Sequence, residues 1–474
     1  MSRITITNIP GINIKASPFS SEQGQTLRAL NVQRDVIGAW EKRPGYNTFL
    51  GTPDNSEIDN LFSWTRNNGT QTFVYRNSGG TLYHSLQGTG AWTISPGGTF
   101  TIAGTHTVPS SRRMGNAVLE NSMILGNGLD YTRHTTTGTD FGSTTSAPIA
   151  RYFAEYENRI WAGGTASDLF YSTTGTLTDW TTDSSSISIP GAGKINGVIK
   201  VADRLNIPKN SGAIFRYDGF RLTDLATNLG PTDYFSTGEI EDFRIWSNKL
   251  GYFGFNGARP ELLSNVIEKQ IYNDLGSAIA GTQFIEIPGI VYKYNYYSSV
   301  GTITEDLTNQ TIPNAIHRYD FQTDEFVNWQ FAVRPRSFGT YLDNSQNVQM
   351  IFGDISGQAY QLSGTVTTDN GSSIPVELMG FIHGNSLDEK KWNFMRFMFN
   401  PGCQAKVQVA ISDTFTYSSL IWQDIGVGID GISELHFPSG TRGRFLFWKV
   451  YESSRNSRFQ LYTIEVDFDP IVHG

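Results

Sequence analysis

The feature that most constrains the fold is a hairpin pattern that recurs roughly every 30 to 45 residues. Each unit consists of a short apolar strand, a turn rich in Gly, Asn or Asp, and a second apolar strand. Repeats of this kind are typical of β-propellers, whose blades bury their faces against neighbouring blades. We therefore predict a β-propeller of six or seven blades over residues 51–365. Its hairpins are expected at residues 73–85, 123–135, 159–173, 212–224, 250–264, 317–329 and 350–363.

The composition also indicates an all-β fold. Charged residues make up only 17% of the 474 residues, and the chain contains 49 Gly, 30 Phe and 21 Tyr. Aromatic residues favour strands, and Gly favours turns. Helix is expected to be scarce, and the one short helix is predicted over residues 261–276, where apolar residues follow helical spacing.

The two ends of the chain do not follow the hairpin repeat. Residues 1–50 show little periodicity, and we expect an extended N-terminal arm, with a disordered leader as the alternative. Residues 365–374 are rich in Thr, Ser and Gly, which predicts a linker. The strands predicted beyond it alternate over longer runs, so residues 366–474 are interpreted as a C-terminal β-sandwich-like domain.

Five residues are predicted to have structural roles in turns. Arg43, Pro44 and Gly45 are expected to fix the turn into the propeller, because Pro-Gly is a strong turn signal. Gly219 and Gly257 are expected in tight hairpin turns, where glycine supplies a positive φ.

No motif indicates an enzyme. The seven histidines are dispersed and Cys403 is the single cysteine, so no zinc-ligand spacing is present. There is no GxSxG elbow and no phosphate-binding loop. Carboxylates do cluster near Asp242, Asp320 and Asp467, which leaves a glycosidase as a weak alternative. We predict no catalytic, cofactor-binding or metal-binding residue, and no cofactor.

Charge and hydropathy restrict the partners. The net charge is −8 with no basic stripe, whereas tight nucleic-acid binding needs clustered Lys and Arg. The N-terminus lacks the apolar core of a signal peptide, and no window has the length of a membrane span. We expect a protein that is made in the cytoplasm and does not insert into a membrane.

Several segments, taken in order from about residue 30 to 365, resemble the tail nozzle proteins of short-tailed double-stranded DNA phages. This family is also called the tail tubular or packaged-DNA stabilisation proteins. The resemblance rests on Asn31-Val32, Gly38, Lys42-Arg43-Pro44-Gly45-Tyr46, Glu157-Asn158-Arg159-Ile160-Trp161-Ala162, Leu169-Phe170-Tyr171-Ser172, Asp179-Trp180, Phe215-Arg216-Tyr217-Asp218-Gly219, Lys249-Leu250-Gly251-Tyr252-Phe253-Gly254-Phe255-Asn256-Gly257, Leu262-Leu263-Ser264, Ile267, Ile316-His317-Arg318-Tyr319-Asp320, Trp329, Gly353-Asp354 and Gly357.

This resemblance implies a structural, non-enzymatic virion protein. It implies a homohexameric ring below the portal and adaptor proteins, in contact with tail fibre or needle proteins. The ring would extend the channel through which packaged DNA is retained and then released, without binding that DNA tightly. A receptor- or glycan-binding propeller on the virion is the alternative, because a propeller fold alone does not fix function.

Overall fold

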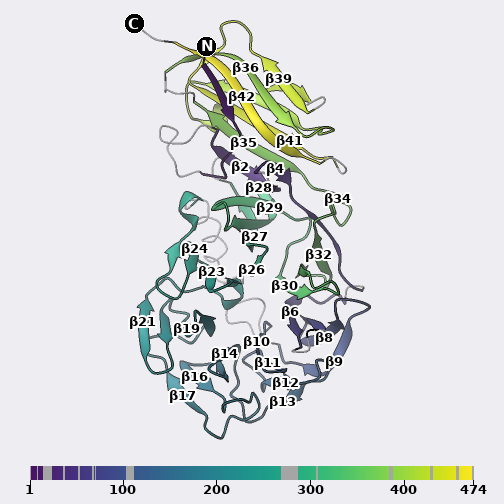
Figure 1. Cartoon of the computed structure of the whole chain (residues 1–474), viewed down its shortest axis with the longest axis vertical. Helices are drawn as coiled ribbons and strands as arrows, with labels where there is room; N and C mark the ends of the chain where they lie inside the picture. The colour runs from purple at the N-terminus through teal and green to yellow at the C-terminus, as the bar shows by residue number, and fades with distance from the viewer. Residues whose placement is uncertain are drawn as a thin grey trace.

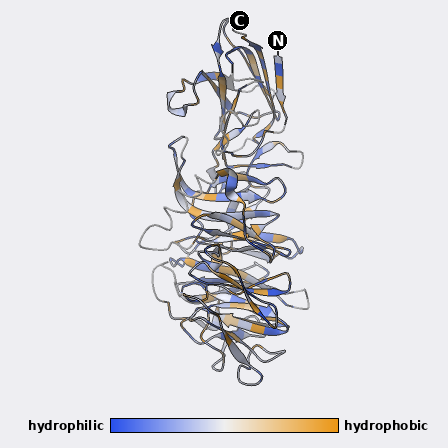
Figure 2. Cartoon of the chain, turned by 90° about the vertical axis from the view of Figure 1, so that its left-hand side faces the viewer, coloured by the Kyte–Doolittle hydropathy of each residue, from blue (hydrophilic) through white to orange (hydrophobic). Residues whose placement is uncertain are grey.

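The computed structural model consists almost entirely of β-strands, in a propeller and a second domain stacked on it (Figure 1). The hydropathy colouring shows apolar positions interleaved with polar ones along the strands of both domains (Figure 2). No helix in the described residues is long and apolar enough to cross a membrane. The structure describes residues 2–7, 9–13, 24–35, 38–51, 54–66, 69, 71–102, 112–267, 287–305, 308–383, 388–427, 431–454 and 458–471.

Seven four-stranded antiparallel blades make up the described part of the propeller. Blades 1 to 5 are separate sheets. Blade 1 contains β6 (Ile58–Thr65), β7 (Thr72–Ser78), β8 (Thr81–Leu86) and β9 (Thr93–Thr99), and blade 2 contains β10 (Gly115–Leu119), β11 (Ser122–Gly126), β12 (Arg133–Thr135) and β13 (Gly142–Ser143). Blade 3 contains β14 (Tyr152–Tyr156), β15 (Arg159–Gly163), β16 (Asp168–Tyr171) and β17 (Ser185–Ser188), blade 4 contains β18 (Ile199–Val201), β19 (Arg204–Pro208), β20 (Ile214–Tyr217) and β21 (Leu222–Ala226), and blade 5 contains β22 (Gly238–Ile240), β23 (Phe243–Asn248), β24 (Gly251–Phe255) and β25 (Glu261–Leu262).

The last two blades belong to larger sheets. Blade 6 consists of β26 (Gly289–Tyr292), β27 (Asn295–Thr304), β28 (Thr311–Asp320) and β29 (Glu325–Gln330). Blade 7 consists of β30 (Ser337–Leu342), β31 (Val348–Gly353), β32 (Ala359–Ser363) and, from the start of the chain, β5 (Gly45–Thr48). The ring therefore closes with a strand that is distant in sequence from the rest of its blade.

Each of the seven predicted hairpins lies in a different blade. Those at residues 73–85, 123–135, 159–173 and 350–363 pair the second and third strands of their blades. The other three, at residues 212–224, 250–264 and 317–329, pair the third and fourth strands. The expectation of a propeller with six or seven blades is confirmed.

Apolar side chains fill the spaces between blades. Trp64 and Phe73 of blade 1 pack with Met123 of blade 2, and Phe153 of blade 3 packs with Ile124 of blade 2. Similar clusters lie between later blades, and one large cluster extends from blades 5, 6 and 7 into the second domain. Consecutive apolar residues such as Met123 and Ile124 point to opposite faces of their blade, so the blade has two apolar faces, one for each neighbouring blade.

The second domain is a β-sandwich, as the sequence predicted. One sheet contains β1 (Ser2–Ile6), β3 (Val32–Arg34), β4 (Trp40–Lys42), β36 (Lys390–Phe399), β39 (Ile432–His436), β40 (Arg442–Gly443) and β42 (Gln460–Pro470). The other contains β2 (Thr26–Leu30), β35 (Val376–Ile382), β37 (Lys406–Ser412), β38 (Gln423–Val427) and β41 (Phe445–Glu452), and the 3-10 turn η3 (Tyr417–Ser419) follows β37. Fully buried Trp392, Phe397 and Trp448 fill the space between the sheets.

A shared sheet joins the two domains. Strand β2 pairs in parallel with β29 of blade 6, where Leu30 lies opposite Asn328, and on its other edge it pairs with β35 of the sandwich. Blade 6 and half of the sandwich therefore form one nine-stranded sheet.

The N-terminal segment is extended, but its described parts do not form a separate arm. Strands β1 to β4 pair within the sandwich, and β5 completes blade 7. The linker expected at residues 365–374 instead contains the short strands β33 (Thr368–Asp369) and β34 (Ser372–Ser373) beside β5. Both segments form backbone hydrogen bonds with strands from other parts of the chain, and these partners are present only in the folded protein.

The helix predicted over residues 261–276 is wrong for its described part. Glu261–Leu262 form β25, and Ser264–Ile267 form a single 3-10 turn, η2. Leu262 pairs with Phe253 of β24, so a sheet partner overrides the local helical spacing. Residues 268–276 lie outside the described residues.

Candidate functional site

The first candidate site is a cavity of about 360 Å³ on the axis of the propeller. It is lined by the first strands of blades 1, 2, 6 and 7 (β6, β10, β26 and β30) and by the 3-10 turn η1 (Tyr234–Ser236). The lining is largely polar and includes Asn60, Ser63, Asn116 and Thr340. A concave site into which several polar groups converge is a candidate for ligand binding.

An arginine network closes one end of this cavity. Arg113, in the linker between blades 1 and 2, forms an ion pair with Asp233, which precedes η1 between blades 4 and 5. The same guanidinium donates a hydrogen bond to the backbone oxygen of Arg336, between blades 6 and 7, at 2.6 Å. These contacts connect linkers from different sides of the axis.

Aromatic stacking extends the network. The guanidinium carbon of Arg113 lies 5.5 Å from the ring centre of Phe235, and that of Arg151 lies 5.1 Å from the same ring. Phe235 therefore contacts both cations, an arrangement that is favourable when partly shielded from water. The side chains of Arg113, Arg151 and Phe235 therefore lie together at this end of the axis.

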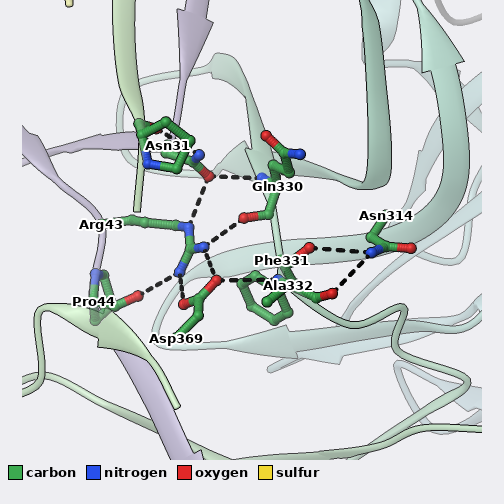
Figure 3. A network of polar contacts seen from close by, with 9 residues as sticks. Asn31, Arg43, Pro44, Asn314, Gln330, Phe331, Ala332 and Asp369 are labelled. Atoms are coloured by element: carbon green, nitrogen blue, oxygen red, sulfur yellow. Dashed lines mark hydrogen bonds and ion pairs between the residues drawn. The ribbon is translucent and has the colours of Figure 1, made fainter. Parts of the chain in front are cut away.

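The second candidate site is the junction between the domains, centred on Arg43 (Figure 3). Arg43 is fully buried, and its two terminal nitrogens donate to the two carboxylate oxygens of Asp369 at 2.9 and 2.6 Å. The remaining N–H groups donate to the side chain of Asn31 and to the backbone oxygens of Pro44 and Gln330. All five donors of the guanidinium therefore have acceptors.

Asn31 and Asp369 extend this junction to the end of blade 6. The Asn31 side-chain oxygen also accepts a hydrogen bond from the backbone N–H of Gln330, and Asp369 accepts one from Ala332. The guanidinium of Arg43 lies 4.6 Å from the ring centre of Phe331. One buried cation thus holds the N-terminal segment, blade 6 and the segment after blade 7 together.

A second ion cluster lies on the shared sheet. Arg28 of β2 pairs with Glu305, which follows β27, and with Glu377 of β35, while Lys449 of β41 pairs with Glu377 at 3.1 Å. Burial raises the pKa of Glu305, and the Arg28 charge opposes this shift. The cluster therefore pairs opposite charges around β2, the strand that joins the two domains.

The turn predicted at Arg43, Pro44 and Gly45 is wrong, because Arg43 and Pro44 connect β4 directly to β5 and Gly45 begins β5. Arg43 and Pro44 are in the junction, and a Cβ added to Gly45 would lie 2.0 Å from the backbone oxygen of Thr368. Gly219, with φ of 92°, lies in the turn between β20 and β21, and Gly257, with φ of 91°, follows β24. Glycine is thus required at position 45 because the Thr368 backbone lies too close for a side chain, and at Gly219 and Gly257 because of their positive φ.

We expect Gly219→Val to lower the free energy of unfolding by about 1–2 kcal/mol, because a β-branched residue is strained at positive φ. Thermal unfolding checks this. Gly364→Val is the matched control, because Gly364 has no positive φ and no atom within 4 Å of an added Cβ. Equal midpoints for the two variants would show that the turn does not need glycine.

Each of the three carboxylate clusters that left a glycosidase open contains carboxylates with structural partners. Asp320 pairs with Arg318 and accepts a hydrogen bond from the backbone of Gln322. Asp467 accepts a hydrogen bond from Asn393, and Glu239 pairs with Arg244. Within the described ranges, no group of three or more His, Cys, Asp or Glu could hold a metal ion. Burial raises the pKa of the Cys403 thiol, which lowers its reactivity.

The axial arginines cannot be recognised in the sequence as one group. They lie in linkers between blades, just before the first strand of the next blade, so they are far apart in sequence and form no basic stripe. Arg112-Arg113 and Arg334-Pro335-Arg336 are the local signals that could have drawn attention to them. Their convergence depends on the ring closing.

The fold and these two networks define a seven-bladed β-propeller protein with an appended β-sandwich. No protein-family model and no curated protein matches the chain. Similar solved structures include the computationally designed Ika8 protein, with 11% identity over 67% of this chain and 99% of that chain and a TM-score of 0.39. The WD40 β-propeller domain of Doa1 has 8% identity over 68% and 97% and a TM-score of 0.30. BBS1N in complex with ARL6DN has 6% identity over 68% and 98% and a TM-score of 0.43. Likenesses this remote carry no functional argument.

Proposed function

We propose that this chain is a structural, non-enzymatic protein of a short phage tail, the nozzle that extends the DNA exit channel. The observation that carries the proposal is the junction at Arg43. Asn31 and Arg43, both in the first segment that resembles the nozzle family, meet there beside Asp369. A motif that fixes how two domains join suits a protein whose role is mechanical.

The construction of the chain also supports this role. A shared sheet and buried ion pairs make the propeller and sandwich one continuous body. A closed ring needs subunits of fixed shape, because cyclic symmetry closes only when each subunit repeats the same angle. In the proposed homohexamer, DNA passes between the copies, since the cavity on each propeller axis is only about 360 Å³ and is closed at one end by side chains.

The net charge suits a channel for DNA. At −8, the chain as a whole repels a polyanion, and a channel should let DNA move without holding it. Adaptor or portal-side proteins above the ring and fibre or needle proteins below it are the proposed partners.

Immunogold electron microscopy of the virions that encode the chain tests this proposal, with antibody raised against the recombinant protein. We expect label on the tail axis directly below the capsid, and a hexamer of the purified chain by native mass spectrometry. Label on peripheral spikes would overturn the nozzle and favour the receptor- or glycan-binding alternative. Virions without label would overturn both.

A further inference from the structure

Arginines gather at the end of the propeller that carries the axial network, together with three carboxylates. The arginines are Arg112, Arg113, Arg151, Arg334 and Arg336, and the carboxylates are Glu57, Asp59 and Asp233. Three ion pairs use all three carboxylates: Arg112 with Asp59, Arg113 with Asp233, and Arg336 with Glu57.

Arg334 occupies a like-charged environment at this end. The charges of Arg336 and Arg113 act on the Arg334 guanidinium, and so does that of Glu57, which is paired with Arg336 at 3.2 Å. Burial, reinforced by Arg336, lowers the pKa of Arg334 to about 10. The Nε atom of Arg334 is buried without a hydrogen-bond partner in the described part of the chain.

The backbone makes room for this cation. Gly301 of β27 has φ of 88°, and a Cβ added there would lie 2.9 Å from the guanidinium carbon of Arg334. Glycine at this bulge therefore lets the guanidinium lie against the strand. The Arg334 side chain remains partly exposed, so a small solute can reach it, and Ser337, the first residue of β30, lines the axial cavity.

We propose that Arg334, with Arg336 and Arg113 beside it, binds an oxyanion, either a phosphate or a carboxylate, at this end of the propeller. A guanidinium presents two parallel N–H donors that match two oxygens of such a group. The anion would pair with Arg334, which has no carboxylate partner among the described residues, and would offset the repulsion among the three arginines. This inference is independent of the proposed tail function, because it concerns the isolated chain.

Isothermal titration calorimetry of the full chain with inorganic phosphate tests the site, with sodium chloride at matched ionic strength as the blank. We expect saturable binding to the wild type. Arg334→Gln should weaken binding by about tenfold or more, because it removes two charge-assisted hydrogen bonds. Arg334→Lys should weaken it less, because the charge stays while the planar fork is lost.

Arg396→Gln is the matched control, since Arg396 is a surface arginine of the sandwich that pairs with Glu434 and Glu465. It should bind phosphate like the wild type. A parallel titration with acetate separates the two sources: tighter binding of phosphate indicates a phosphate group, and tighter binding of acetate indicates a carboxylate such as a peptide terminus.

Absence of saturable binding by both anions would overturn the proposal, and so would equal affinity in the wild type and Arg334→Gln. The variant remains testable, because removing a half-buried cation from beside two others should leave its unfolding midpoint in chloride unchanged or higher. A lower midpoint would show that Arg334 is a structural cation and would overturn the assignment.

Discussion

Arg43→Met is expected to lower the free energy of unfolding by about 3–5 kcal/mol, the cost of breaking one partner out of a buried ion pair. The reason lies mainly in what remains. Asp369 is buried, and without the guanidinium its charge would face mostly backbone and apolar groups, while the acceptors on Asn31 and Gln330 would also lose a donor. Urea denaturation followed by tryptophan fluorescence measures the change.

Two further variants make this experiment specific. Arg396→Met removes a half-exposed arginine that also has two carboxylate partners, and we expect the free energy of unfolding to fall by at most about 1 kcal/mol. Arg43→Met combined with Asp369→Leu should recover part of the stability, because no buried charge is then left unpaired. If Arg43→Met and Arg396→Met lower the free energy of unfolding by the same amount, the junction is not what holds the domains together.

Tyr46→Ala is expected to lower the free energy of unfolding by about 3–5 kcal/mol, the usual range for truncating a buried aromatic residue. Tyr46 belongs to β5, the strand that completes blade 7, and its side chain is fully buried. Its ring centre lies 5.1 Å from that of Phe331, 4.9 Å from Phe352 and 5.2 Å from Tyr360. Because β5 closes the ring, the loss should also raise the susceptibility of blade 7 to proteolysis.

Phe220→Ala is the control for Tyr46→Ala. Phe220 is 98% exposed in the turn after β20, so its truncation should change stability by no more than about 0.5 kcal/mol. Limited proteolysis followed by mass spectrometry locates the first cuts in each variant. If Tyr46→Ala unfolds at the wild-type urea concentration, the N-terminal strand is not needed to close the propeller.

The local sequence determined the blades. Short apolar runs send successive side chains to both faces of a strand, and Gly, Asn and Asp set the turns, so every predicted hairpin falls in its own blade. The positive φ of Gly219 and Gly257 is equally local, since a tight turn requires it whatever lies around it. Strand and turn preferences act over a few residues and can be read directly.

Only the tertiary structure decided which distant residues meet. Arg43 and Asp369 are 326 positions apart, and the sequence marked one as a turn residue and left the other in an expected linker. The axial arginines converge because the ring brings successive linkers to one end of the axis, and β25 is a strand because β24 offers it an edge. Ion pairing and strand pairing act between groups brought close by the whole fold, so their partners cannot be read from local periodicity.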